Sequence, residues 1–343
     1  MRDVARVLQQ VHLRYGTDAE PGIRRLGTSK FRYRSEETGR PPAAADLERI
    51  RQLAVPPAWT DVWIAADSHS HLQATGRDQR GRKQYRYHAV FADGTAALKF
   101  GELIHFGLAL GSLRRRVQRD LSANDLTHDC IVAVVVRLLD VTSLRVGNES
   151  YARENKTFGL TTLRSRHVAI RGTRVNFGFV GKSHHRFDLE VASPVMARLV
   201  RKCQDLPGQM LFQYRTEDGA LRPVTSQDVN EYLADHCGSL ATAKTFRTWN
   251  ASLAAGHALS AASGIGPSSP TTLNQVIDTV ADELGNTRAV CRRSYVHPAL
   301  VTAYMDGSFQ KKWEAAPPAR PSGLSADERR LLRLLRRSSS TSA

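Results

Sequence analysis

Cysteine is scarce in this sequence, and no two cysteines lie close together. The chain of 343 residues has four, at Cys130, Cys203, Cys237 and Cys291. A structural zinc site or a dithiol redox centre is usually built from close pairs such as CxxC, so the spacing argues against both. We expect four reduced thiols, most of them buried.

Long apolar runs are also missing. No uninterrupted run approaches the ~20 apolar residues that span a membrane, although the hydrophobic content of 41% is ordinary for a globular protein. The N-terminal stretch from Met1 to Leu8 is charged early and lacks a small-residue cleavage site, so no secretory signal is recognised. These features predict a cytoplasmic protein with no membrane partner.

A glycine is absent where a nucleotide-binding loop would need one. The stretch Gly181-Lys182-Ser183 ends like a phosphate-binding loop, but Asn176 stands in place of the first glycine, and a strand rather than a helix is predicted to follow. Two pairs of nearby histidines are weak metal candidates, His69 with His71 and His184 with His185. We therefore expect no cofactor and no metal.

Acidic residues are outnumbered by basic ones. The chain has 49 Lys and Arg against 33 Asp and Glu, which gives a net charge of +16 and a pI near 10.2. Such an excess attracts polyanions, and nucleic acid is the commonest large polyanion in a cytoplasm. The charge favours nucleic-acid contact without indicating any sequence specificity.

The chain is longer than one hydrophobic core usually serves, and its composition changes at Ala92-Asp-Gly-Thr95. We predict an α+β protein with a small N-terminal antiparallel β-sheet domain at 1–95. A larger, mainly helical domain with a three-stranded meander follows at 96–315. A basic helix and a disordered Ser-rich tail are expected at 316–343.

A polar and aromatic strand is predicted after the basic loop that ends at Lys83. In Gln84-Tyr85-Arg86-Tyr87-His88 the alternation places Tyr85 and Tyr87 on one face and Gln84, Arg86 and His88 on the other. Such a strand can contact bases or phosphates in a DNA groove. It is equally consistent with a half-buried strand that contributes two tyrosines to a core.

Helical periodicity predicts helices at 100–121 and 127–139, and alternation predicts a three-stranded meander between Lys156 and Val191. Lys182 would lie at the tip of its last hairpin. Gly147 and Asn148 indicate a helix C-terminus or a turn, where Arg145 would simply cap carbonyls.

Two further motifs are weak when each is considered alone. Lys244 and Arg247 are three residues apart and share a helix face, which is usually solvent-exposed. Tyr295 follows Arg292 and Arg293, and it is consistent with a surface tyrosine in a basic turn before Pro298. A phenol with a pKa near ~10 needs neighbouring cations to act as a nucleophile.

Four segments together are more specific than any one of them. In chain order they are Leu-Arg145-Val-Gly-Asn-Glu, Phe-Val-Gly-Lys182-Ser, Lys244-Thr-Phe-Arg247-Thr-Trp-Asn-Ala-Ser and Ser-Tyr295-Val-His-Pro. This set resembles the type IB DNA topoisomerases in their compact bacterial and poxvirus form. The resemblance extends to Pro56-Pro57-Ala58-Trp59 and to the Gly-Arg-Lys-Gln-Tyr-Arg-Tyr run, so it covers most of the chain.

The resemblance implies a role for each residue. Tyr295 would attack a DNA phosphodiester and form a 3′-phosphotyrosyl bond, while Arg145 and Arg247 stabilise the developing charge. Lys182 would protonate the leaving 5′-hydroxyl. Supercoils would be removed by strand rotation and religation, without ATP or metal. The expected partner is double-stranded DNA, clamped by a monomer associated with the nucleoid.

One position departs from the poxvirus and nuclear enzymes, which have histidine nine residues before the tyrosine. This chain has Asn286 there. An amide can donate a hydrogen bond to a phosphate oxygen but cannot titrate, so we expect Asn286 to position the phosphate. Imidazole acid chemistry at this position is then in doubt.

Two other functions remain open at this point. A tyrosine recombinase shares the Arg, Lys, Arg, Tyr set, but it usually has histidine where this chain has Lys244, and its DNA-binding domain is helical. A basic DNA-binding protein that kept the fold without catalysis is the second alternative. Contacts from Lys83, Gln84, Tyr85, Arg86, Tyr87 and Lys244 to DNA are expected under the topoisomerase interpretation.

Overall fold

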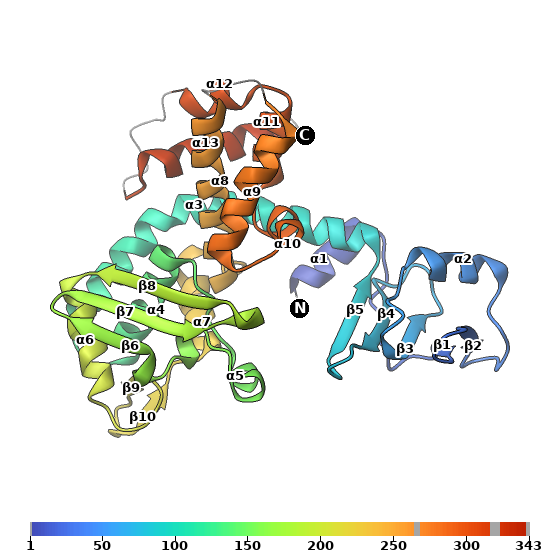
Figure 1. The fold of residues 1–343 in the computed structure, drawn as a ribbon, viewed down its shortest axis with the longest axis horizontal. Helices are drawn as coiled ribbons and strands as arrows, with labels where there is room; N and C mark the ends of the chain where they lie inside the picture. Colours follow the sequence, from blue (N-terminus) through green and yellow to red (C-terminus); the bar gives the residue numbers. More distant parts are fainter. Residues whose placement is uncertain (1, 264–267, 316–322, 341–343) are drawn as a thin grey trace. The chain divides into compact units, whose positions relative to one another are not determined.

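The computed structural model describes residues 2–263, 268–315 and 323–340. The chain divides into two compact units between Lys99 and Phe100, and Figure 1 traces their helices and strands in chain order. Each unit is described by itself below. The domain limits at 95/96 and 315/316 rest on the sequence and stay predictions.

The first unit contains the predicted antiparallel sheet. Its strands pair in the order β2-β1-β3-β4-β5. They are β1 Gly22–Leu26, β2 Arg32–Ser35, β3 Thr60–Ala65, β4 Leu72–Arg77 and β5 Lys83–Tyr87. Strand β3 has both faces covered, because Val62 and Ile64 pack with Ile23 and Ile50 whereas Trp63 is buried in a separate cluster. Strand β5 lies at the edge of the sheet.

Three helices accompany this sheet: α1 Arg2–Gln10, α2 Ala44–Gln52 and the start of α3 Ala89–Ser122. Helix α3 begins at Ala89 and runs without a break through Ala92–Thr95, where the sequence composition changes. Gly94 does not interrupt it, because a single glycine costs a helix only about 1 kcal/mol.

Helix α3 is long and apolar enough, by length and composition, to cross a membrane. No uninterrupted apolar run marks this helix in the sequence, because Lys99, Glu102 and His105 interrupt it. Its side chains Leu103, Phe106, Leu110 and Leu113 are buried in the core of the second unit. A core helix of this kind passes the same test, so the finding is weak evidence for a membrane span.

The second unit is mainly helical, as predicted. After α3 come α4 His128–Thr142, α5 Glu149–Asn155, α6 Pro194–Gln204, α7 Ser226–Cys237 and α8 Ala243–Ser263. They are followed by α9 Pro270–Leu284, α10 Arg288–Ser294, α11 Pro298–Met305, α12 Phe309–Glu314 and α13 Ala326–Ser340. Part of the tail predicted at 316–343 lies outside the described residues.

The predicted meander is present as β6 Val168–Arg171, β7 Arg174–Val180 and β8 Arg186–Ala192, drawn in green in Figure 1. Val175, Phe177 and Phe179 of β7 face the core, so the alternation was interpreted correctly. Short helical turns lie at Leu160–Thr162, Ser165–His167 and Lys182–His184. A small pair, β9 Gln213–Arg215 with β10 Leu221–Pro223, was not predicted.

The turn predicted as one alternative at Gly147 and Asn148 is present, since Gly147 has φ 108°. It leads into a helix instead of ending one, because the Asn148 side chain accepts the Tyr151 amide as the N-cap of α5. The left-handed residue that ends α4 is Ser143, with φ 56°. Arg114 of α3 is bound to Asp140 and Glu328 at 2.8 Å each.

All four cysteines are free, as predicted. Cys130, Cys203 and Cys291 are buried, and Cys237 is partly buried. Burial raises the pKa of the Cys203 thiol to about 12, so this thiol stays protonated and unreactive at neutral pH.

Candidate active site

Tyr295 lies at the C-terminal end of α10, in a short corner before α11. Its amide donates to the Cys291 carbonyl at 2.9 Å, which closes the last turn of the helix. Ser252 of α8 stabilises this corner with two hydrogen bonds. Its hydroxyl donates to the Tyr295 carbonyl at 3.1 Å and accepts the His297 amide at 3.0 Å. Tyr295 is only 8% exposed, so the interpretation as a surface tyrosine is wrong.

Arg145 and Arg247 converge on one carbonyl oxygen at the end of α9. Arg145 Nη1 donates to the Leu284 oxygen at 3.4 Å and Arg247 Nη2 donates to it at 2.9 Å. Arg247 also donates to the carbonyl of Ser143. The two guanidiniums therefore cap the carboxyl ends of two helices, where the helix dipoles favour positive charge.

The tyrosine ring lies against this pair. The Arg247 guanidinium carbon is 5.2 Å from the centroid of the Tyr295 ring. Arg247 is 3% exposed, which corrects the expectation of an open basic helix face.

Asn286 completes the arrangement. Gly285 ends α9 in a left-handed conformation with φ 60°, and the Asn286 amide then donates back to the Ala281 carbonyl at 2.8 Å. This turn brings the Asn286 Oδ1 atom to 2.7 Å from Arg145 Nη2. The Asn286 Nδ2 group is buried and has no hydrogen-bond partner among the described residues. We call Arg145, Arg247, Asn286 and Tyr295 the arginine corner.

The arginine corner carries positive charge without a carboxylate to balance it. Across residues 2–263, 268–315 and 323–340, neither Arg145 nor Arg247 forms an ion pair. Burial lowers the pKa of Arg145 to about 10, and the neighbouring charge of Arg247 adds to the effect. Burial also lowers the pKa of Arg247, while the Tyr295 oxygen acts in the opposite direction. Two desolvated cations and a spare amide donor form a site that favours an anion.

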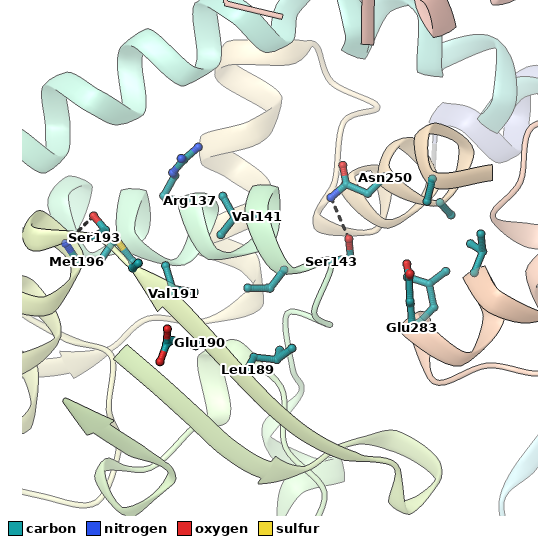
Figure 2. A pocket seen from close by; sticks show the side chains of 16 residues that line it. Arg137, Val141, Ser143, Leu189, Glu190, Val191, Ser193, Met196, Asn250 and Glu283 are labelled. Carbon is teal, nitrogen blue, oxygen red and sulfur yellow. Dashed lines mark hydrogen bonds between the residues drawn. The ribbon is translucent and has the colours of Figure 1, made fainter. Parts of the chain in front are cut away.

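A cavity of about 570 Å³ lies behind the carbonyl groups that hold the arginines. Figure 2 shows its lining, where the Asn250 side-chain amide donates to the Ser143 hydroxyl at 2.9 Å. Glu283, in the last turn of α9, also lines the cavity. Leu284 also lines it, whereas the four side chains of the arginine corner do not. The cavity is therefore lined by Ser143 and Leu284, whose carbonyls bind the arginines, and it is separate from the arginine corner itself.

Two family models match the chain. The model of the eukaryotic DNA topoisomerase I catalytic core matches residues 91–317, and the model of the bacterial DNA topoisomerase IB N-terminal domain matches residues 30–78. The chain belongs to the type IB DNA topoisomerases. It is therefore an enzyme of the DNA topoisomerase class, as the four segments predicted.

Individual relatives agree with this assignment. The chain is 33% identical to DNA topoisomerase 1B of Acanthamoeba polyphaga mimivirus over 286 residues, which covers 81% of this chain and 85% of the relative. It is 23% identical to DNA topoisomerase 1B of Vaccinia virus over 177 residues, covering 50% and 56%. A DNA topoisomerase 1 of Mycosarcoma maydis is 28% identical over 194 residues, covering 50% of this chain and 19% of the relative.

Lys182 is the one predicted catalytic residue of this topoisomerase that lies outside the arginine corner. It is exposed in the turn between β7 and β8, where Ser183 and His184 adopt left-handed conformations with φ of 63° and 59°. No described residue forms a hydrogen bond or an ion pair with its side chain. We call Gly181 to His185 the Lys182 turn. A Cβ atom added at Gly285 would be 2.9 Å from the His185 ring, so this turn lies against the residue next to Asn286.

The predicted DNA contacts of β5 lie on an open edge strand. Tyr85 and Tyr87 are 49% and 46% exposed and stack at 6.1 Å, so they are not core tyrosines. Lys83 pairs with Asp18, Gln84 donates to Asp78, and Arg86 donates to the Ala54 carbonyl. In the second unit, Lys244 is exposed on α8, one turn before Arg247.

Sequence reasoning missed Ser252 and the carbonyl groups of Ser143 and Leu284. Ser252 was part of the segment that carried the resemblance, and its spacing of five residues from Arg247 was the available signal. Backbone carbonyls carry no such signal, because every residue has one.

Proposed function

We propose that this topoisomerase relaxes supercoiled double-stranded DNA, and that Tyr295 is the nucleophile that cuts one strand. The Tyr295 oxygen forms a bond to the phosphorus as the bond from phosphorus to the 5′ oxygen breaks. The phenol loses its proton to solvent, and the leaving oxygen gains one. A 3′-phosphotyrosyl bond and a free 5′-hydroxyl result.

Arg145 and Arg247 bind the non-bridging oxygens of the attacked phosphate. Negative charge grows on these oxygens in the transition state, and guanidiniums that are already desolvated and oriented stabilise it without reorganisation. The single observation that carries the proposal is that both arginines share the Leu284 carbonyl while Arg247 lies 5.2 Å from the Tyr295 ring centroid.

Asn286 and Lys182 supply the remaining roles. The unpartnered Asn286 Nδ2 group donates to a phosphate oxygen, and Arg145 orients the amide through its Oδ1 atom. Lys182 protonates the departing 5′ oxygen when DNA and the Lys182 turn approach each other. Its exposure and its lack of partners within the described chain leave the side chain able to reach the oxygen.

Resealing reverses the same chemistry. The phosphotyrosyl bond retains the free energy of the phosphodiester, so the 5′-hydroxyl can attack it without ATP. The nicked strand rotates before this step and releases supercoils. We further propose that the protein acts as a monomer that closes around the duplex and that it associates with the nucleoid.

Relaxation of a supercoiled plasmid tests this function. We expect relaxation by the full chain in EDTA without ATP, and a protein-DNA adduct after rapid denaturation. Tyr295→Phe should form no adduct and relax no plasmid while it still binds DNA. Unchanged relaxation by Tyr295→Phe would exclude this tyrosine as the nucleophile, and relaxation that requires paired target sites would favour recombination.

A further inference from the structure

Asn250 lies on α8 one turn after Arg247, and its side chain binds the end of a different helix. Its Nδ2 group donates to the Asp140 carbonyl at 3.0 Å and to the Ser143 hydroxyl at 2.9 Å. Figure 2 shows the second of these bonds beside the cavity. Because a side-chain amide has two N–H donors, Asn250 can form both bonds at once. It thereby binds both the last turn of α4 and the residue that caps it.

The Asp140 carbonyl belongs to the last turn of α4, which ends at Thr142. An α-helix leaves its last four carbonyls without an amide partner inside the helix, and that of Asp140 is one of them. The Leu144 amide, four residues further on, donates to the Thr142 hydroxyl at 3.4 Å. The Asn250 side chain therefore supplies the donor that the backbone would provide if the helix continued.

Ser143 has a backbone conformation that residues other than glycine seldom adopt. Its φ of 56° and ψ of 19° lie in the left-handed region. In this conformation its carbonyl accepts a hydrogen bond from Arg247, while its hydroxyl accepts one from Asn250. Arg247 and Asn250 are three residues apart and share a face of α8. One face of α8 therefore binds Ser143 through both its backbone and its side chain.

We propose that Asn250 is a positioning residue for Arg247, and that it acts through Ser143. This role rests on the proposed cleavage of DNA by Tyr295. Without the Asn250 amide, the left-handed residue has no side-chain anchor, and the carbonyl that orients the Arg247 guanidinium is free to move. Arg145 depends less on this anchor, because its own carbonyl accepts the Leu160 amide at 2.9 Å.

The test compares two variants that each lose a side-chain amide. Asn250→Ala removes the proposed anchor. Gln204→Ala is the matched control, because Gln204 is also partly buried and donates to two backbone carbonyls, those of Ser165 and Val168, at 3.1 and 3.0 Å. Cleavage is measured in a single turnover, on a duplex that the wild-type chain cleaves and at saturating protein, so that DNA affinity does not contribute to the rate. Thermal melts of both variants report the cost in stability.

We expect Asn250→Ala to slow cleavage by about 10²-fold, the effect of misplacing a catalytic group by about 1 Å. Gln204→Ala should lower the melting temperature to a similar degree and keep the wild-type rate. Ser143→Gly is a second variant, which removes the hydroxyl but suits the left-handed conformation. It should melt near the wild-type temperature and still cleave slowly, which separates positioning from stability.

A double-mutant cycle tests the route through Arg247. In an Arg247→Ala background, Asn250→Ala should slow cleavage much less than it does in the wild-type chain, because the group it positions is gone. The same fold-loss in both backgrounds would overturn the proposal. So would equal losses of rate in Asn250→Ala and Gln204→Ala, or wild-type cleavage by Ser143→Gly. Absence of cleavage by the wild-type chain would instead contradict the proposed function.

Discussion

The arginine corner and the Lys182 turn are built in opposite ways. In the arginine corner, backbone carbonyls and one asparagine hold the guanidiniums, and Arg247 is 3% exposed. In the Lys182 turn the amine is exposed, and no described residue binds it. If the proposed roles hold, the groups that bind the phosphate are in place before DNA arrives, whereas the acid is positioned only when DNA is bound.

Lys182→Ala should give the largest loss that spares the fold. Removing a general acid typically slows a reaction by about 10²- to 10⁴-fold, and an exposed side chain without partners adds little to stability. Single-turnover cleavage should fall by that amount at an unchanged melting temperature. A substrate whose leaving oxygen is replaced by sulfur needs no proton, so it should recover the rate. No recovery with sulfur would remove Lys182 from the acid role.

Arg247→Ala should affect both rate and stability. Loss of one oriented donor to a charged transition state costs about 10²- to 10³-fold in rate. The Ser143 carbonyl also loses a donor, which we expect to destabilise the fold by about 1 kcal/mol. Arg247→Lys is the matched control, and it should stay slow because an ammonium group cannot reach both carbonyls. Rapid cleavage by either variant contradicts the role of this arginine.

Substitutions of Asn286 test whether this position acts by hydrogen bonding or by acid chemistry. We expect Asn286→Ala to slow cleavage by about tenfold, the effect of losing one hydrogen bond to a charged group. Asn286→His should be tolerated, because imidazole also donates to a phosphate oxygen. Equal cleavage rates for wild type and Asn286→Ala would show that Asn286 does not contact the phosphate.

His297, which lies two residues after Tyr295, should make the stability of the fold around the arginine corner depend on pH. Burial lowers the pKa of His297 to about 4 from its usual 6.5, and its Nδ1 atom accepts the Ala299 amide. Below pH ~6.5 the unfolded chain binds a proton at His297 that the folded chain does not, so stability is full above that pH and declines toward pH ~4, by about 3 kcal/mol. His297→Asn keeps an N-cap acceptor and should flatten the decline in a pH series of thermal melts. An unchanged slope in this variant would assign the decline to other groups.

The sequence named the side chains that the structure brings together, but not the groups that hold them. Arg145, Arg247 and Tyr295 were singled out because the proposed chemistry needs particular side chains in a recurring context. Their supports were not, since the carbonyls of Ser143 and Leu284 carry no sequence signal. Ser252 was in view, but only the folded chain shows that it binds both sides of the Tyr295 corner.

The fold was predicted where periodicity was long and failed where it was short or interrupted. The meander followed from alternation over three strands. Strands β9 and β10 have three residues each, too few for a pattern. At Gly147 and Asn148 the sequence left a helix C-terminus and a turn open, because asparagine suits both ends of a helix.

Helix α13 contains none of the proposed catalytic residues, but its Glu328 stabilises the packing of the second unit. It is 4% exposed, binds Arg114 at 2.8 Å and accepts the indole N–H of the fully buried Trp249 at 3.4 Å. A gene with a premature stop codon just before α13 would still encode Arg145, Lys182, Arg247, Asn286 and Tyr295. In its product, however, Arg114 would lose one of its two carboxylate partners. We therefore expect such an allele to cause misfolding although every proposed catalytic residue is retained.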